Sequence, residues 1–430
     1  MLKKVFLGLF LLLAVSFYLF PFSFPFLPYA INSKILVAAF GVAAFIYDSI
    51  RRHGMFFSEP TLFSGLLAAI FSVWTLFCIT IANTYTTDYA DYIVSYLTWM
   101  FGAYGAYSIL RTSYEKVDLE ILVRYLALVG VFQCVIAVMI DNISFFERLV
   151  DHIHTDASYY REHDRMYGLG AALDPAGVRF SVILVMIAHQ FSTCPNVRNS
   201  SIYQTTDLIA YAIITIIGAV ISRTTVVGAG LGLFYIIITL IRMRKGGFVT
   251  TRMVQAFFWF FIVMAGIIGA AIYFYRVSNT FQGYLRFGFE AFFNWVETGE
   301  FSTSSTDHLE TMWVWPTDTR TWLIGRGEFG VFETDSDIGY CNFIFLCGLI
   351  GMVIFSFFFL YCHIVQNRKF RMFGLTSILL IAITFIVWMK VTTDIFFIDA
   401  LLFCIVGDFE DEQEDVDATR VLPKDIGLRR

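Results

Sequence analysis

The feature that most constrains this chain is a series of apolar stretches, each long enough to cross a lipid bilayer as a helix. A hydrocarbon core about 30 Å thick takes roughly 20 residues of helix. Such stretches follow one another along most of the 430 residues, with polar segments between them. We place them at residues 5–20, 34–50, 61–83, 91–110, 119–140, 176–194, 206–221, 224–241, 254–275, 338–365, 372–389 and 394–407.

The composition agrees with a protein that lives in lipid. Hydrophobic residues make up 58% of the chain and charged residues 15%, and the mean hydropathy is +0.69. The hydrophobic fraction is higher and the charged fraction lower than in ordinary soluble domains. We therefore predict an all-α polytopic integral membrane protein with about twelve transmembrane helices. The first stretch lacks a small-residue cleavage site, so we expect a retained helix rather than a signal peptide. Nucleic acid is not an indicated partner.

The basic residues between the apolar stretches predict an orientation, because Lys and Arg concentrate in cytoplasmic loops. With a cytoplasmic N-terminus, the outer short turns hold only Lys34, Arg223 and Lys390. The inner turns then hold Lys3, Lys4, Arg51, Arg52, Arg111, Lys116, Arg198, Arg242, Arg244, Lys245, Arg252, Arg368, Lys369 and Arg371. We predict a transmembrane domain over residues 1–407 and an acidic cytoplasmic tail over 408–430, with both termini cytoplasmic.

Two long polar stretches, residues 141–175 and 276–336, fall on the predicted outer face. Loops of this length are often functional. They collect the side chains His152, His154, His163, Arg148, Arg161, Arg165, Arg276, Arg286, His308, Arg320 and Arg326. A guanidinium group binds phosphate oxygens through two parallel hydrogen bonds and keeps its charge. We therefore expect an anionic ligand on this face.

Two arginines occupy positions suited to that ligand. Arg223, in "AVISRTTVVGAG", stands in a tight turn at the bilayer edge, where an arginine is costly unless it is paired or reaches water. Arg165 precedes a glycine-rich turn and a helix start in "RMYGLGAALDPAGVRF", an arrangement that favours a bound anion. Taken singly, Arg223 equally suits an anchor to lipid headgroups and Arg165 an ordinary loop-to-helix junction. Together they favour a bound phosphate or pyrophosphate.

A metal site is the alternative use of these loops. His152, His154 and His163 are close enough in sequence to share a zinc ion, but the HExxH pattern of membrane metalloproteases is absent. The cysteines all lie in or at the ends of apolar stretches and suit packing. We predict neither a metal nor a cofactor.

Three motifs resemble those of the O-antigen polymerase and O-antigen ligase superfamily of bacterial cell-envelope glycosyltransferases. They are "RMYGLGAALDPAG" at the end of the first long loop, "SRTTVVGAGLGLFYIIITLIR" at the next outer turn, and "WLIGRGEFG" followed by "DSDIGYCNFIFLCGLIGMVIFSF". The third resembles a G-x-G segment that leads into x-G-L-x-G on a helix. The arrangement of apolar stretches around two long outer loops is also similar over most of the chain.

This resemblance implies a GT-C-like fold in the bacterial inner membrane that transfers a glycan from undecaprenyl pyrophosphate to an acceptor sugar on the periplasmic face. Arg165 and Arg223 match arginines that hold the pyrophosphate in this superfamily. Arg320 and Arg326 flank the G-x-G segment and are expected to contact phosphate or sugar. The implied partners are an undecaprenyl-pyrophosphate-linked oligosaccharide, the bilayer and a regulator of polysaccharide chain length.

The resemblance favours a polymerase over a ligase. A ligase is expected to carry a histidine just before the x-G-L-x-G helix, whereas "ETDSDIGYCN" has none. The reaction needs a base for the acceptor hydroxyl, and we select Asp337 first and His308 second, with Asp335 as an alternative. Asp337 equally suits a helix N-terminus, where a carboxylate is favourable. For His308, a plain surface histidine is the favoured interpretation when the residue is taken alone. A flippase or exporter of lipid-linked glycan is the more distant alternative.

Overall fold

The computed structural model describes residues 2–52, 58–162, 165–245, 251–370 and 373–406. These residues fold into helices, and their β pairing is limited to an isolated antiparallel bridge between Ser23 and Asn32. The predicted all-α fold is confirmed for this part of the chain. The predicted acidic tail, residues 408–430, lies outside the described residues.

Long helices coincide with the apolar stretches of the sequence. They are α1 (Leu2–Leu19), α2 (Ser33–Arg52), α3 (Glu59–Ala82), α4 (Tyr92–Arg111), α5 (Leu119–Asn142), α8 (Leu173–Thr193), α10 (Ser201–Ile221), α11 (Thr225–Lys245), α12 (Thr251–Val277), α18 (Gly339–Lys369), α19 (Gly374–Val387) and the helix Phe396–Val406. Each predicted stretch overlaps one of them.

Not all of these helices have the length of a full membrane crossing. Among the described residues, eight are long and apolar enough to span a bilayer. Phe6–Leu19 in α1, α19 and Phe396–Val406 are apolar but shorter, and α4 is not one of the eight. The protein is therefore a polytopic membrane protein, and the number of about twelve spans stays a prediction.

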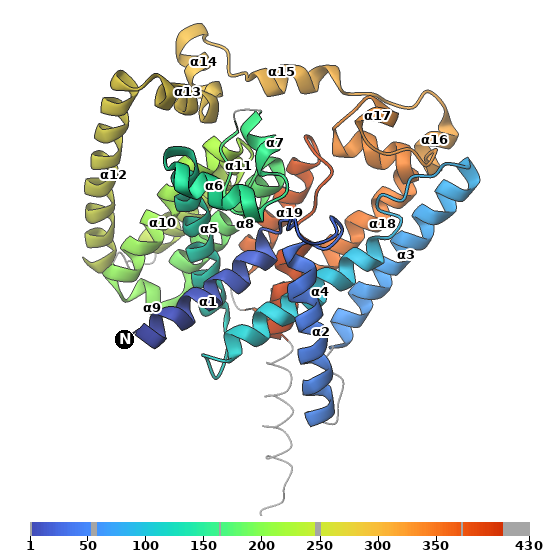
Figure 1. Ribbon diagram of the computed structural model, residues 1–430, viewed down its shortest axis with the longest axis horizontal. Coiled ribbons are helices and arrows are strands. Elements are labelled where there is room, and N and C mark those ends of the chain that lie inside the picture. Colours follow the sequence, from blue (N-terminus) through green and yellow to red (C-terminus); the bar gives the residue numbers. More distant parts are fainter. Residues whose placement is uncertain (1, 53–57, 163–164, 246–250, 371–372, 407–430) are drawn as a thin grey trace, which may run out of the picture.

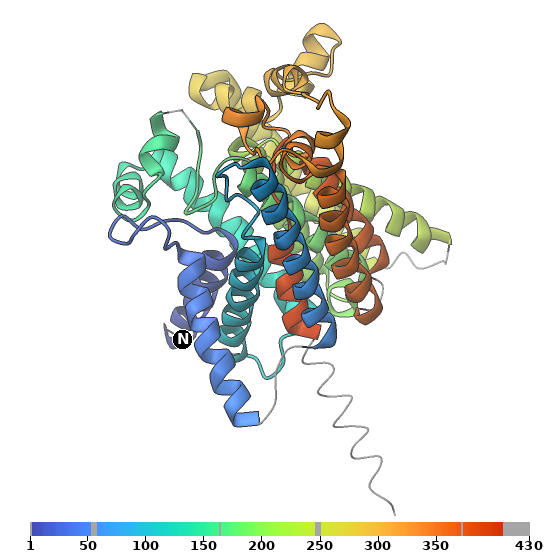
Figure 2. The same cartoon turned by 90° about the vertical axis from the view of Figure 1, so that its right-hand side faces the viewer.

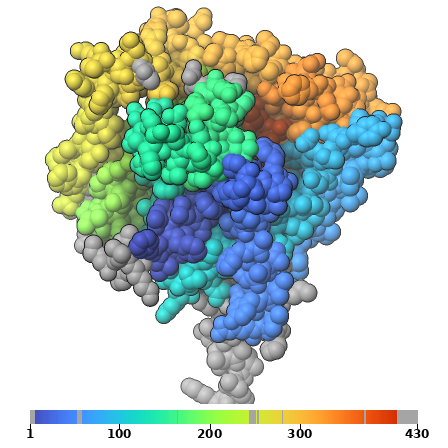
Figure 3. Space-filling model, viewed as in Figure 1, coloured from blue at the N-terminus to red at the C-terminus, as the bar shows by residue number. Residues whose placement is uncertain are grey.

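Short helices gather at one end of the bundle, which we call the loop face: the end that carries residues 143–172 and 278–338 (Figures 1 and 2). They are α6 (Ser144–Ile153), α7 (Ala157–Glu162), α13 (Asn279–Gly288), α14 (Glu290–Thr298), α15 (Ser304–Thr311), α16 (Thr319–Ile324) and α17 (Val331–Thr334). A further short helix, α9 (Pro195–Arg198), joins α8 to α10. In the space-filling view, the yellow and orange residues after α12 cover the loop face (Figure 3).

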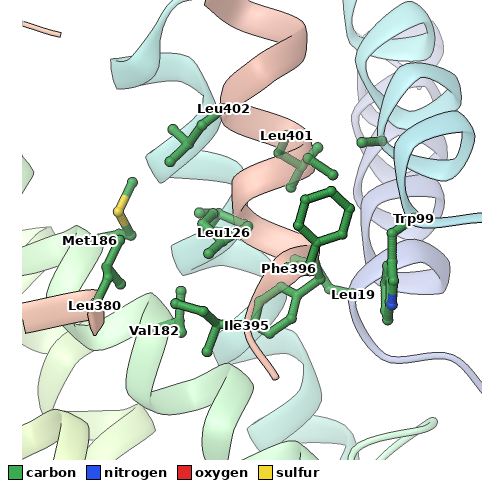
Figure 4. Packing of buried hydrophobic residues seen from close by; sticks show 14 of the residues in the cluster. Leu19, Trp99, Leu126, Val182, Met186, Leu380, Ile395, Phe396, Leu401 and Leu402 are labelled. Carbon is green, nitrogen blue, oxygen red and sulfur yellow. The ribbon is translucent and has the colours of Figure 1, made fainter. Parts of the chain in front are cut away.

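Helix α8 forms the centre of the bundle. Its spanning segment is 89% buried, and it packs against α5, α10, α11 and α19. Val182 and Met186 of α8 meet Leu126, Leu380 and Ile395 in the apolar core (Figure 4). By contrast, the spanning segment of α12 is 0% buried and stands at one edge (Figure 1). Because this surface is apolar, it is suited to contact lipid.

Helices α2 and α4 approach each other through glycines. A Cβ at Gly41 would lie 1.8 Å from the carbonyl oxygen of Phe101, and one at Gly105 would lie 2.4 Å from that of Val37. Membrane helices commonly use small residues in this way. In lipid the hydrophobic effect does not drive helices together, so their association depends on close packing of the backbones.

Helix α18 is broken at Gly348, whose φ of +67° is outside the helical range. Three carbonyl groups before the break, at Phe345, Leu346 and Cys347, receive hydrogen bonds from elsewhere. The donors are the peptide N–H groups of Arg326 (2.7 Å) and Gly327 (3.2 Å) and the indole Nε1 of Trp74 (2.9 Å). Carbonyls at membrane depth need such partners. The "GRG" segment therefore supplies hydrogen-bond donors to carbonyl groups next to the break in α18.

Candidate functional site

A cavity of about 410 Å³ opens on the loop face. It is lined by Arg165, Leu173, Asp174, Ile221, Ser222, Arg223, Phe287, Ser304, Ser305, His308, Leu309, Met312, Asp337, Lys390 and Val391. Four of the predicted site residues, Arg165, Arg223, His308 and Asp337, are among them. These four come from segments far apart in the chain, so the fold brings them together around one space.

The two arginines are held against one aromatic ring. The guanidinium carbon of Arg165 lies 4.8 Å, and that of Arg223 4.1 Å, from the centroid of the Phe287 ring on α13. An aromatic face attracts cations at such distances. Burial lowers the pKa of Arg223 below its ordinary value, and the nearby charge of Arg165 lowers it further, while Glu290 opposes both. The ring thus helps to hold two like charges close to the same cavity.

Hydrogen bonds with α8 hold the turn that carries Arg223 in place. Ser181 Oγ donates to the Thr224 carbonyl (2.9 Å) and accepts from the Gly228 N–H (3.1 Å). Gly177 lets the start of α8 approach this turn, because a Cβ there would lie 2.4 Å from Ser222 Oγ. The glycine in "LDPAGVRF" therefore serves close packing beside the cavity.

Arg223 has protein partners on its guanidinium. It forms an ion pair of 2.5 Å with Glu290, the first residue of α14, and Nε donates to the Phe287 carbonyl (2.9 Å). A longer contact of 3.5 Å joins it to Ser304 Oγ. In the described part of the chain, no carboxylate forms an ion pair with Arg165. Arg165 therefore presents the more available positive charge.

Asp174 and Lys390 complete the wall of the cavity, and neither was selected from the sequence. Asp174, in the first turn of α8, accepts from Lys390 Nζ (2.7 Å), Thr224 Oγ1 (2.7 Å) and Ser222 Oγ (3.2 Å). It thereby joins α8, the α10–α11 turn and the segment after α19. The sequence shows Asp174 in "ALDPAG" and Lys390 in a predicted outer turn, but nothing in it indicates that these two residues pair.

The two candidate bases lie at the open side of the cavity. His308 is an exposed residue of α15, and Asp337 is exposed two residues before α18 begins. Among the residues that the structure describes, neither side chain has a hydrogen-bond or ion-pair partner. Both are thus free to meet a ligand. Asp335, the alternative, caps α17 with a φ of +59° and does not line the cavity.

Arg320 and Arg326 line a different space, a second cavity of about 370 Å³ between the end of α3 and α16. Its wall comprises Cys78, Ile81, Ala82, Thr84, Asp318, Arg320, Thr321, Gly325, Arg326 and Glu328. Arg326 pairs with Glu328 at 2.5 Å and lies 4.4 Å from the Phe345 ring centroid. The predicted arginines are therefore divided between two cavities.

The histidines of the first loop point in different directions. His152 Nδ1 lies 2.7 Å from the carbonyl oxygen of Arg148 on its own helix, whereas His154 is buried and stacks on Phe22 at 5.3 Å. His163 lies outside the described residues. Within the described ranges, no group of three or more His, Cys, Asp and Glu side chains is arranged to hold a metal ion.

Comparison with known proteins gives no relative from which to assign these residues. No family model, curated protein or solved structure matches the chain.

Proposed function

We propose that the protein is a surface-polysaccharide polymerase of the O-antigen type, a GT-C-like glycosyltransferase that joins undecaprenyl-pyrophosphate-linked repeat units. The observation that carries this proposal is the cavity shared by Arg165, Arg223, His308 and Asp337. It combines fixed positive charge with a carboxylate that has no partner among the described residues, and it opens at the end of the bundle that carries the long loops.

The proposed reaction is a displacement at the anomeric carbon of the growing chain. A hydroxyl oxygen of the acceptor unit forms a bond to that carbon, and the bond from the carbon to the pyrophosphate oxygen breaks. The electron pair leaves with undecaprenyl pyrophosphate, and the hydroxyl proton passes to the Asp337 carboxylate, with His308 as the second candidate. Arg165 and Arg223 offset the charge that develops on the leaving group.

The proposed location is the bacterial inner membrane, with the loop face toward the periplasm and both termini in the cytoplasm. The distribution of Lys and Arg between the two sets of turns supports this orientation. A regulator of chain length is a proposed partner.

An exporter would need polar groups that line a path through the bundle. Polar side chains do occur inside it: Gln366 Nε2 donates to Asp399 Oδ1 (2.8 Å) next to His363. All three are fully buried and line neither of the two cavities described above. Charge that lines a cavity at one end of the bundle supports glycan transfer over transport.

The test is complementation of cells that lack the native protein, with surface glycan read as a ladder on a gel. Wild type should restore the ladder, and Arg223→Ala should leave single repeats. Glu297→Gln is the matched control, because this exposed ion pair with Arg286 lies outside the cavity. Loss of single-repeat attachment in the null strain, with lipid-linked polymer accumulating, would instead identify a ligase.

A further inference from the structure

Three tryptophans form a row on the loop face, in which Trp315 and Trp322 are stacked and Trp313 is tilted by 33° against Trp315. The ring centroids of Trp313 and Trp315 are 5.4 Å apart, and those of Trp315 and Trp322 are 5.5 Å apart with an angle of 15° between the planes. Trp322 Nε1 donates to the Pro316 carbonyl (2.8 Å), which fixes that ring. Trp313 and Trp315 remain 36% and 42% exposed. We call these three residues the tryptophan row.

The row lies between the two cavities along the chain. Met312, just before it, lines the cavity of the candidate site, and Trp313 lines a neighbouring cavity of about 670 Å³. Asp318, Arg320 and Thr321, between Trp315 and Trp322, line the second cavity. This part of the chain runs across the loop face from α15 to α16 (Figure 1). A molecule held by both cavities would therefore lie close to the segment that carries the indoles.

We propose that the tryptophan row and the second cavity form a binding site for the extended glycan chain, several sugar units away from the reacting centre. This inference rests on the proposed function, because a polymerase must hold a chain as well as its activated end. The site would add affinity for long chains without touching the pyrophosphate.

The chemistry of the site suits sugars. A pyranose ring presents C–H groups on one face, which pack on an indole, and hydroxyl groups around its edge. The indole face supplies a large apolar surface with a negative quadrupole. Asp318, Arg320 and Thr321 place a carboxylate, a guanidinium and a hydroxyl next to it, which can bond sugar hydroxyls as acceptor and donors. A few polar groups beside an aromatic surface are typical of small-molecule sites.

Tryptophans also occur where proteins meet the membrane surface, as separate rings at headgroup level. The row differs because its rings contact one another and because neighbouring residues of the same segment line a cavity with four charged side chains: Asp318, Arg320, Arg326 and Glu328. Lipid contact is therefore the competing outcome of the experiment below.

The first experiment measures binding of polysaccharide released from the cell envelope by mild acid, which removes lipid and pyrophosphate. The purified protein is held in nanodiscs, and affinity is measured calorimetrically. Replacing Trp315 and Trp322 together by Ala should weaken binding by about tenfold or more. The double Phe variant should retain most of it, which also guards against misfolding. Trp295→Ala is the control, because this 56% exposed indole on α14 lies outside the row.

Three results would overturn the inference: no binding by wild type, equal binding by wild type and the double Ala variant, or an equal loss with Trp295→Ala. Lipid contact has its own signature, since lipids brominated in their tails would quench wild-type fluorescence more than that of the double Phe variant. Such quenching, with unchanged glycan binding, would make the row a membrane anchor.

The second experiment separates this inference from the proposed function. In complemented cells, the double Ala variant should give a ladder of shorter chains while the first joining step survives, unlike Arg223→Ala. A ladder of wild-type length would overturn the glycan site alone. If wild type restores no ladder and yet binds released glycan through the row, the polymerase proposal fails and the glycan site stands.

Discussion

Arg223 and Glu290 form an ion pair of 2.5 Å that joins the turn between α10 and α11 to the first residue of α14. Both side chains are largely buried, with exposed fractions of 17% and 23%. Glu290 also accepts from the N–H (3.0 Å) and Oγ (3.2 Å) of Ser304. The Glu290 carboxylate is thus already paired with the guanidinium group of Arg223, which we propose as a binding group for pyrophosphate.

The first prediction concerns this competition. Glu290→Gln keeps the shape and one acceptor oxygen of the side chain but removes the charge that opposes an incoming anion. We expect binding of inorganic pyrophosphate to the purified protein to tighten by about three- to tenfold, measured calorimetrically. Glu297→Gln, on the same helix but outside the cavity, should change nothing. Weaker binding by Glu290→Gln would show that Glu290 orients Arg223 for the ligand.

The second prediction concerns the base. Asp337→Asn should lower the rate of glycan joining by about 100- to 10,000-fold, because the amide accepts no proton. Asp335→Asn is the matched control two residues away, and Asn tolerates its positive φ. The measurement is polymer formation from purified lipid-linked repeats. If His308→Gln shows the large loss and Asp337→Asn does not, the two roles are reversed.

The third prediction concerns the break in α18. Gly348→Ala would place a Cβ 2.3 Å from backbone atoms of Leu323 and force an L-residue into a φ of +67°. With a ψ of −176°, this backbone conformation is essentially restricted to glycine and costs another residue about 1–3 kcal/mol, and the clash adds to it. We expect a lower unfolding temperature in detergent. Gly230→Ala, on α11 with nothing within 4 Å of its Cβ, should be neutral or stabilising, since Ala favours helix.

The fourth prediction concerns pH and His154, which caps α6 on the loop face. Burial lowers its pKa from 6.5, against the opposing charge of Asp156. The unfolded segment therefore binds the proton more readily than the folded one. Stability contributed by neutral His154 is present above about pH 6.5 and is lost progressively as the pH falls.

Hydrogen–deuterium exchange of residues 144–160, corrected for the intrinsic effect of pH, tests this expectation. Wild type should exchange faster at about pH 5.5 than at about pH 7.5, because the charged imidazole disrupts the stack on Phe22 and the hydrogen bond from the Asp156 N–H (3.1 Å). His154→Gln should remove the pH dependence. A variant that keeps it would place the titrating group elsewhere.

Much of the helical fold could be predicted from hydropathy alone, because apolar runs of bilayer length have few other uses. Where the prediction exceeded the structure, length is the reason for three helices, whereas α4 has 20 residues and is not apolar enough. Helix α19 stops at Val387, and Lys390, three residues on, reaches Asp174 across the cavity. A helix of 14 residues rises about 21 Å, less than a hydrocarbon core of about 30 Å. An apolar run does not reveal where its helix ends.

The candidate site was predictable in part from the charged residues of the sequence. Arg165, Arg223, His308 and Asp337 were found because charged side chains next to membrane helices are unusual. The separation of Arg326 from them was not predictable, since it follows from a backbone contact between the "GRG" segment and the break in α18. Asp174 and Lys390 were missed because they are far apart in sequence, and only the fold pairs them.

The closure of the broken α18 by α3 and the "GRG" segment divides the candidate site into a stiff half and a loosely held half. Trp74 of α3 and the backbone after α16 donate hydrogen bonds to the carbonyls at the break, so these elements form one frame with α18. Asp337 lies two residues before α18 begins. Helices α14 and α15 have no buried residue and pack little on the core. Asp337, which we propose as the proton acceptor, therefore lies beside a firmly bonded frame, whereas Glu290 and His308 belong to helices that pack little on the core.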